Sequence, residues 1–315
     1  MRFHCLLPVR DEADILAQTL NHALAWADSI WVYDTGSVDC SWEIVQEAAA
    51  RDKRVIPVDK APVFFSETHL RPYLFDLARR QMEEGDWFLR MDADEFHHVS
   101  PRDFVTQMMR PHETLAYHQY FDFRLLKSEA EAWGEGGETV ADRSRPIEER
   151  RRNYTVSVYS EPRLCRYRTT MKWPAGISFP FNAGYVARER LPIRHYPHRD
   201  PLQLQRRCRL RALMMGDPTH DGQSYLHWLE DDWKSLLTPD DAPGLLHWPP
   251  GRELPQVRQL NHLRKGQVRL AQRLLHAGLL PLMDRRRPAF GAEDKPVPLP
   301  AELARNLETL LNPKN

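Results

Sequence analysis

The chain has 315 residues, 42% of them hydrophobic, and its 44 lysines and arginines balance its 44 aspartates and glutamates. A chain of this size can bury a substantial core, and its lack of net charge argues against non-specific binding of nucleic acid. The four cysteines have no paired spacing, which indicates free thiols rather than a disulfide framework or a zinc site. Neither a membrane-spanning apolar run nor a signal-peptide pattern is present, so we expect a cytoplasmic protein.

The first hundred residues alternate between strand and helix patterns. Short apolar runs predict strands at 3–9, 29–33, 54–58 and 86–91, and apolar residues at helical spacing predict helices at about 15–24, 42–50 and 68–84. Ser100, Pro101 and Asp103 are typical of a helix start, with the serine as N-cap. This alternation predicts an α/β fold with a mostly parallel sheet flanked by helices.

The second half of the chain has a different character. Strand-like runs at 114–125, 155–160, 163–168 and 192–196 are separated by proline and glycine. Residues 127–152 are charged and contain glycine, which predicts a flexible surface loop. A proline-rich linker at 238–255 leads into a basic amphipathic stretch, so we expect a helical C-terminal extension over 206–315.

An acidic cluster, "MDADEFHH", follows the fourth predicted strand directly. Asp92 and Asp94 can aim two carboxylates at one point, and such hard oxygen donors suit Mg²⁺ or Mn²⁺. The alternative is a solvated acidic turn paired with an arginine. Glu95 is expected to orient the turn or a bound sugar, and the two histidines that follow, His97 and His98, are expected at the surface.

Further signals lie at the same predicted edge of the sheet. Asp34 ends the second strand before a Thr-Gly-Ser turn, and "PVRDEAD" follows the first strand. Ligands of parallel α/β sheets bind outside the carboxyl ends of the strands. His195 and His198, in "IRHYPHRD", are far away in sequence, but a neutral imidazole can complete a carboxylate metal site.

The motifs "LLPVRDEADIL", "VYDTGSVDCS" and "GDWFLRMDADEF", in this order, resemble family 2 glycosyltransferases of the Rossmann-like GT-A fold. The segment "RHYPHRDP" is similar to a stretch that closes the catalytic domain in many bacterial members. The resemblance implies a GT-A catalytic domain at 1–205. Residues 1–110 would form its nucleotide-sugar half and 111–205 its acceptor half, including the loop at about 127–152.

The resemblance also implies roles for individual residues. Those expected to bind the nucleotide sugar are Pro8, Arg10, Glu12, Asp34, Arg71 and Asp92. The metal ion, Mn²⁺ or Mg²⁺, would be held by Asp94, with Asp92 near it, and by His195 or alternatively His198. For Arg71 the alternative is an ordinary charge on a helix surface.

The implied activity is metal-dependent transfer of a sugar from a nucleoside-diphosphate sugar to an acceptor hydroxyl. A hexosyltransferase-like enzyme, inverting the anomeric centre in bacterial glycan or glycolipid synthesis, is expected. The catalytic base is unassigned; Asp122 and Glu161 are the available candidates, with structural roles as their alternatives. The donor's sugar and base, the acceptor and the oligomeric state stay open.

Two other functions stay open from sequence. A non-catalytic nucleotide-sugar binding protein on the same fold would explain the missing base. A nucleotidyltransferase would also use aspartates on an α/β sheet, although the loop after the first strand, "PVRDEAD", has no phosphate-binding glycine. The basic helix predicted at 258–282 is a candidate for peripheral contact with an anionic membrane, where lipid-linked acceptors lie. The alternative, which the pattern favours, is that its leucine face packs on the catalytic domain.

Overall fold

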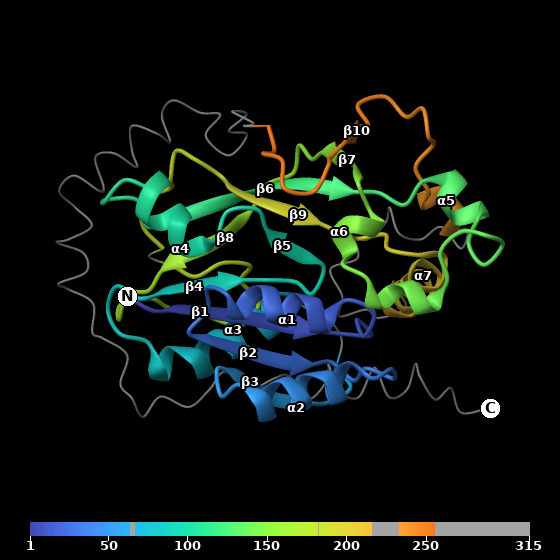
Figure 1. The fold of residues 1–315 in the computed structure, drawn as a ribbon. Helices are drawn as coiled ribbons and strands as arrows, with labels where there is room; N and C mark the ends of the chain where they lie inside the picture. Colours follow the sequence, from blue (N-terminus) through green and yellow to red (C-terminus); the bar gives the residue numbers. More distant parts are fainter. Residues whose placement is uncertain (64–66, 182, 216–232, 256–315) are drawn as a thin grey trace.

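The computed structural model describes residues 1–63, 67–181, 183–215 and 233–255 (Figure 1). The strands are β1 (Phe3–Val9), β2 (Ser29–Asp34), β3 (Val55–Lys60), β4 (Trp87–Arg90), β5 (Glu95–His97), β6 (Leu115–Phe123), β7 (Asn153–Val156), β8 (Pro162–Arg166), β9 (Leu191–His195) and β10 (Leu246–His247). The α-helices are α1 (Leu16–Leu24), α2 (Ser41–Arg51), α3 (Glu67–Ala78), α4 (Pro101–Asp103), α5 (Lys127–Glu131), α6 (Ile147–Arg150) and α7 (Pro201–Met215). The predicted α/β class is therefore confirmed.

The strands form one mixed sheet in the order β10-β7-β6-β8-β4-β1-β2-β3. The segment β4-β1-β2-β3 is parallel throughout, as predicted. β8 runs antiparallel to both β4 and β6, so β6 regains the direction of the first four strands. β9 pairs in parallel with β6 and antiparallel with β5. The carboxyl ends of β1, β2, β4, β6 and β9 therefore face one edge, where α7 also lies (Figure 1).

The alternation of side chains along β1 explains why helices cover both faces of the parallel sheet. Cys5 and Leu7 pack into a core that includes the apolar face of α1, where Leu20 is buried. Leu6 points to the opposite face and packs with Leu74 of α3. Successive side chains of a strand alternate between the two faces of a sheet, so a continuous apolar run is buried on both.

Most predicted elements are found within a few residues of their expected bounds. β1 matches the prediction at both ends, and the Ser100 Oγ accepts a hydrogen bond from the Asp103 backbone N–H (3.1 Å), as a helix N-cap should. The helix that follows has one α-helical turn and continues as a π-helix over Phe104–Met108. The predicted helix at 68–84 is shorter, because α3 ends at Ala78 in a 3₁₀ turn.

The segment 127–152 is not the loop that its composition predicts. It contains α5, a 3₁₀ turn at Val140–Ser144 and α6. Arg150 and Arg151 are buried and contact Glu138, and Arg143 pairs with the fully buried Asp200 at the start of α7. Ion pairs within the segment and to α7 therefore hold the charged residues that suggested a solvated loop.

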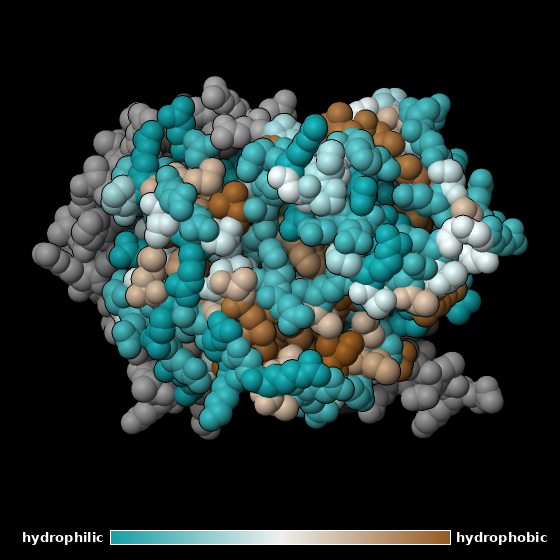
Figure 2. Space-filling model, in the orientation of Figure 1, coloured by the Kyte–Doolittle hydropathy of each residue, from teal (hydrophilic) through white to brown (hydrophobic). Residues whose placement is uncertain are grey.

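Of the predicted C-terminal extension, the structure describes α7, a 3₁₀ turn at Trp233–Leu236 and β10; the basic stretch at 258–282 lies outside the described residues. Within the described part of the chain, no helix combines the length and apolar character needed to cross a bilayer. The face seen in Figure 2 is mostly hydrophilic, with hydrophobic residues in small separate groups. All four cysteines are free, as expected.

Candidate functional site

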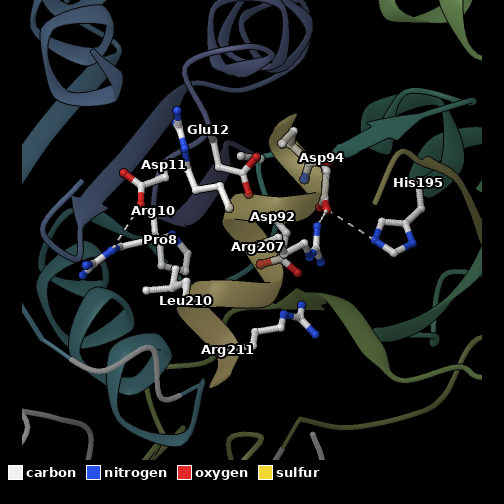
Figure 3. A pocket seen from close by; sticks show the side chains of 13 residues that line it. Pro8, Arg10, Asp11, Glu12, Asp92, Asp94, His195, Arg207, Leu210 and Arg211 are labelled. Atoms are coloured by element: carbon white, nitrogen blue, oxygen red, sulfur yellow. Dashed lines mark hydrogen bonds and ion pairs between the residues drawn. The ribbon is translucent and has the colours of Figure 1, made fainter. Parts of the chain in front are cut away.

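A cavity of about 190 Å³ opens at the carboxyl edge of the parallel strands. It lies where β1, β4 and β9 end and where α7 crosses them (Figure 3). Its lining residues are Pro8, Arg10, Asp11, Glu12, Asp92, Ala93, Asp94, His195, Gln203, Arg206, Arg207, Leu210 and Arg211. Six of these, from three motifs far apart in sequence, are among the residues expected to bind a nucleotide sugar or a metal.

The loop after β1 forms one wall of the cavity, and hydrogen bonds to the loop after β2 hold it in place. The Asp11 backbone N–H donates to the Ser37 Oγ (2.8 Å), and the Asp11 carboxylate accepts from the Val38 backbone N–H (2.8 Å). Asp11 adopts a positive φ of 52°, which aspartate tolerates better than most residues. The Arg10 guanidinium donates to the Thr35 carbonyl.

Arg199, in the turn between β9 and α7, neutralises the acids of this loop. It is fully buried, and its guanidinium forms a fork on Asp14, with nitrogen–oxygen distances of 2.6 and 3.0 Å, and also contacts Glu12. Burial raises the pKa of Glu12 to about 7; Arg199 opposes the shift, whereas Asp94 and Asp14 add to it. Glu12 therefore titrates near neutral pH.

Asp92 is paired with two buried arginines. Arg71 contacts one carboxylate oxygen, and Arg163 Nη2 lies 3.1 Å from the other. Burial favours the protonated form, but Arg71 and Arg163 outweigh it and hold the pKa of Asp92 below its usual value. Arg71 also donates to the carbonyls of Leu6 (2.7 Å) and Met91 (2.8 Å) and is fully buried. The alternative of a helix surface charge at Arg71 is therefore wrong.

Asp94 is surrounded by three cationic groups. Arg207 Nη1 lies 2.9 Å from its Oδ2, His195 Nε2 3.6 Å and Arg199 Nη1 4.0 Å (Figure 3). Against the effect of burial, His195, Arg207 and Arg199 hold the pKa of Asp94 well below its usual value. Asp94 is therefore a carboxylate at all physiological pH values.

Glu95 is the best-protected acid of the cluster. It is fully buried, its Oε2 accepts from the Asp92 backbone N–H (3.0 Å), and its Oε1 contacts Arg163 (2.8 Å) and the Tyr120 hydroxyl. The expectation that Glu95 orients the acidic turn agrees with the hydrogen bond to Asp92. His97 is also buried, with 2% of its surface exposed, so its expected surface position is wrong; it packs edge-on against Trp26.

The histidine beside Asp94 is held by a second carboxylate. His195 Nδ1 lies 2.7 Å from the Oδ1 of Asp122, and the ring stacks on Tyr120. Burial lowers the pKa of His195, but Asp94 and Asp122 outweigh it and raise the pKa to about 9. His198 is buried and does not line the cavity, so of the two candidate histidines it is His195 that lies next to the acidic turn.

These contacts can be compared with the needs of a divalent cation. Within the described ranges, no three His, Cys, Asp or Glu side chains converge as a complete metal site. Asp94 and the Nε2 of His195 do converge, and Asp122 occupies the position of a carboxylate that orients a metal-ligating imidazole. Mg²⁺ commonly takes one or two protein ligands and completes its shell with water and phosphate oxygens. Asp94 and His195 therefore fit as the two protein ligands of such a cation. Asp92 is engaged by Arg71 and Arg163 instead.

Asp34 lies at the end of β2, outside the lining of the cavity. Its Oδ1 accepts from the backbone N–H groups of Gly36 (2.9 Å) and Ser37 (2.6 Å), the turn-capping role weighed as the alternative. Its Oδ2 is buried and has no hydrogen-bond partner in the described part of the chain. Because a buried acceptor without a partner is costly, this oxygen is a candidate for a ligand N–H.

Both candidate bases are engaged in ion pairs. Asp122 contacts His195 and also Arg124, with an Nη2–Oδ2 distance of 3.1 Å. Glu161 accepts from the Tyr159 hydroxyl (2.8 Å) and contacts Arg163 (3.0 Å). Burial opposes ionisation of Glu161, but Arg163 and Arg90 outweigh it and lower the pKa.

The residues that sequence reasoning missed are arginines. Arg163, Arg199 and Arg207 neutralise the acidic cluster, and the interpretation of the sequence assigned none of them. Arg199 lies inside the segment "RHYPHRD", in which the sequence offers only the two histidines as candidate site residues. Three carboxylates within four positions require positive partners. A search for arginines near the other motifs therefore includes Arg199.

No protein-family model matches the chain, and no functionally described protein matches it by sequence. Among solved structures, it is similar to the mannosyltransferase PcManGT from Pyrobaculum calidifontis, in complex with GDP-Man and Mn²⁺, at 13% identity and a TM-score of 0.37, covering 100% of this chain and 88% of that one. It is also similar to glucosyl-3-phosphoglycerate synthase from Mycobacterium tuberculosis, in complex with Mn²⁺, UDP and glucosyl-3-phosphoglycerate, at 14% identity and a TM-score of 0.27. That match covers 52% of this chain and spans only 56% of the synthase.

Proposed function

We propose that this chain is a glycosyltransferase of the GT-A type that binds a nucleoside-diphosphate sugar together with a divalent cation. One observation carries the proposal. Pro8, Arg10, Glu12, Asp92, Asp94 and His195 belong to three separate motifs of the resemblance, and they line one cavity at the carboxyl edge of a parallel sheet. This edge is where α/β proteins bind nucleotides.

The residues of the cavity have complementary tasks in this proposal. Asp94 and His195 would hold the cation, and Asp122, beside Nδ1, would keep the neutral imidazole in the tautomer that presents Nε2 to it. When bound, the cation offsets the negative charge of the diphosphate. Asp92 stays ionised between its two arginines. The Oδ2 of Asp34, which lies outside the lining of the cavity and has no hydrogen-bond partner among the described residues, would accept an N–H from the nucleobase.

The proposal is tested by calorimetric titration of UDP, GDP and dTDP, each with and without Mn²⁺. We expect one nucleotide to bind in the presence of Mn²⁺, and the Asp94→Asn variant to weaken this binding about 10- to 100-fold, as for a charged contact. Asp241→Asn is the matched control, because Asp241 is exposed and far from the lining residues in sequence. If the wild-type protein binds none of the three, the proposal is wrong.

The stereochemistry of the transfer depends on whether the site supplies a catalytic base. Inverting transfer needs a base for the acceptor hydroxyl, and we assign Asp122 to His195 instead, which leaves Glu161 as the candidate. The engagement of both acids in ion pairs favours one alternative, a protein that binds the nucleotide sugar without turnover. Release of the nucleoside diphosphate from the bound donor, measured with wild type and Glu161→Gln, distinguishes the two. Binding without release would support the non-catalytic function.

A further inference from the structure

Helix α7 contributes three arginines to the cavity, opposite the acidic wall. Arg206, Arg207 and Arg211 all line it. Arg207 and Arg211 are four residues apart, so they lie on the same face of the helix. Figure 3 shows both side chains projecting from α7 on the side of the carboxylates. A cavity with acids on one wall and arginines on the other suits a ligand that brings both a cation and a phosphate.

Arg207 is one of several positive neighbours of Asp94. Its Nη1 contacts Asp94 Oδ2 (2.9 Å) and the Pro197 carbonyl (3.1 Å). Asp94 also has Arg199 Nη1 at 4.0 Å, so it would keep this guanidinium beside the divalent cation if Arg207 moved away. Arg207 is therefore a surplus counter-ion of Asp94, in contrast to Arg199, whose fork is committed to Asp14.

The chemistry of a guanidinium decides what Arg207 would bind once released. Its planar fork matches two phosphate oxygens, and such charge-assisted pairs are stronger than neutral hydrogen bonds. The side chain is 17% exposed, so the contact would form largely out of water. Arg211, one turn further along the same face, extends the positive surface in the same direction.

Building on the proposed function, we propose that Arg207 is an exchanging counter-ion. It pairs with Asp94 in the ligand-free protein and moves to the diphosphate of the donor when the divalent cation takes its place beside Asp94. Arg211 supports the diphosphate in the bound state. The exchange makes each ligand favour the binding of the other. The cation displaces Arg207 from Asp94, and the diphosphate binds the displaced side chain.

Binding measurements on Arg207→Gln test this exchange, because the two ligands should respond in opposite directions. We expect the variant to bind the nucleoside diphosphate about 10- to 100-fold more weakly than wild type, for loss of a charged hydrogen bond. The nucleoside without phosphates should bind unchanged, which also shows that the pocket has folded. Mn²⁺ alone should bind roughly fivefold more tightly, because a competing positive charge has gone. Arg207→Lys, which keeps the charge and loses the fork, should fall between.

Arg209→Gln is the matched control, since Arg209 is an exposed arginine of the same helix that does not line the cavity. If Arg207→Gln binds the diphosphate as tightly as Arg209→Gln does, the exchange is wrong while the proposed function stands. If Mn²⁺ binding also weakens in Arg207→Gln, Arg207 supports the cation site instead of competing for it, and the exchange is again wrong. If the wild-type protein binds no nucleoside diphosphate, the proposed function fails and this inference fails with it.

Discussion

At the scale of single residues, the site is a set of carboxylates that share arginines and one histidine. Asp92, Asp94 and Glu95 lie within four positions, and each meets a cationic group: Asp92 meets Arg71 and Arg163, Asp94 meets Arg207, and Glu95 meets Arg163. The like charges are tolerated because positive partners separate them. The pocket residues carried by sequence motifs could be predicted. Of their arginine partners, the sequence points to Arg71 but not to Arg163, which is 71 positions from Asp92 and meets it only through the pairing of β8 with β4.

The imidazolium of His195 makes a testable contribution to stability in the absence of metal. Its pKa of about 9 in the folded protein lies above the usual value of 6.5, so its stabilising effect is complete below about pH 6.5 and is lost as pH rises through 9. The loss amounts to at most about 3 kcal/mol. Replacing Asp122 by Asn should lower this pKa and make the loss smaller.

The measurement is the free energy of unfolding in denaturant with EDTA, at pH 6.5 and pH 9, for wild type, Asp122→Asn and Asp241→Asn. The exposed control should follow wild type at both pH values. A parallel decline in all three proteins would show that Asp122 does not set the pKa of His195.

At the scale of elements, the alternation of strand and helix in the first hundred residues was a sufficient signal, because apolar periodicity reports directly which faces are buried. The segment 127–152 differs from its prediction because its composition gives no such signal. Its charges read as solvated, but Arg143 reaches Asp200 (2.7 and 2.9 Å), a residue 57 positions later. Composition indicates which residues are charged, but it does not indicate whether a partner far away in sequence neutralises them.

Asp200 holds this segment against α7, and its removal should release the segment. Asp200 contacts Arg143 and Arg150, and it also caps α7 by accepting from the Gln203 backbone N–H (2.9 Å). Asp200→Asn keeps a capping side chain and removes the charge. Loss of one partner from a buried ion pair costs about 3–5 kcal/mol, so we expect faster cleavage by trypsin within 143–152.

Limited proteolysis with mass spectrometry measures the rate at each arginine, and Asp241→Asn again serves as the control. An exposed pair offers an internal comparison. Arg145→Gln removes a contact with Asp142 that is partly in solvent, and the free energy of unfolding should fall by less than about 1 kcal/mol. Equal cleavage of Asp200→Asn and wild type would mean that apolar packing alone fixes the segment.

At the scale of the whole molecule, Arg199 joins the beginning of the sheet to its last parallel strand. It contacts Glu12 and Asp14 in the loop after β1, 187 and 185 positions away, while lying between β9 and α7. Neither end of this contact is apolar, so the periodicity that reveals the core gives no signal for it. The sheet order itself, in which β8 separates β4 from β6, likewise depends on pairings that local patterns do not specify.

Arg199→Met should therefore destabilise the entire fold. It leaves the carboxylates of Asp14, 5% exposed, and Glu12, 18% exposed, without their principal partner, at a cost of about 3–5 kcal/mol. Arg206→Met is the matched comparison, because Arg206 is 47% exposed and its pair with Asp39 should contribute less than about 1 kcal/mol. Chemical denaturation at pH 7 measures both. Similar unfolding midpoints for the two variants would show that desolvation cancels the attraction at Arg199.

The distance in sequence between Glu12 and Arg199 also has a meaning during protein synthesis. Ribosomes add roughly 5–20 residues per second, so the acids after β1 wait roughly 10–40 s for the arginine 187 positions later. All four strands β1 to β4 have been synthesised by residue 90, long before that arginine exists. The nascent chain can therefore build its parallel core early, while the cavity gains its second wall only when the turn into α7 has left the ribosome.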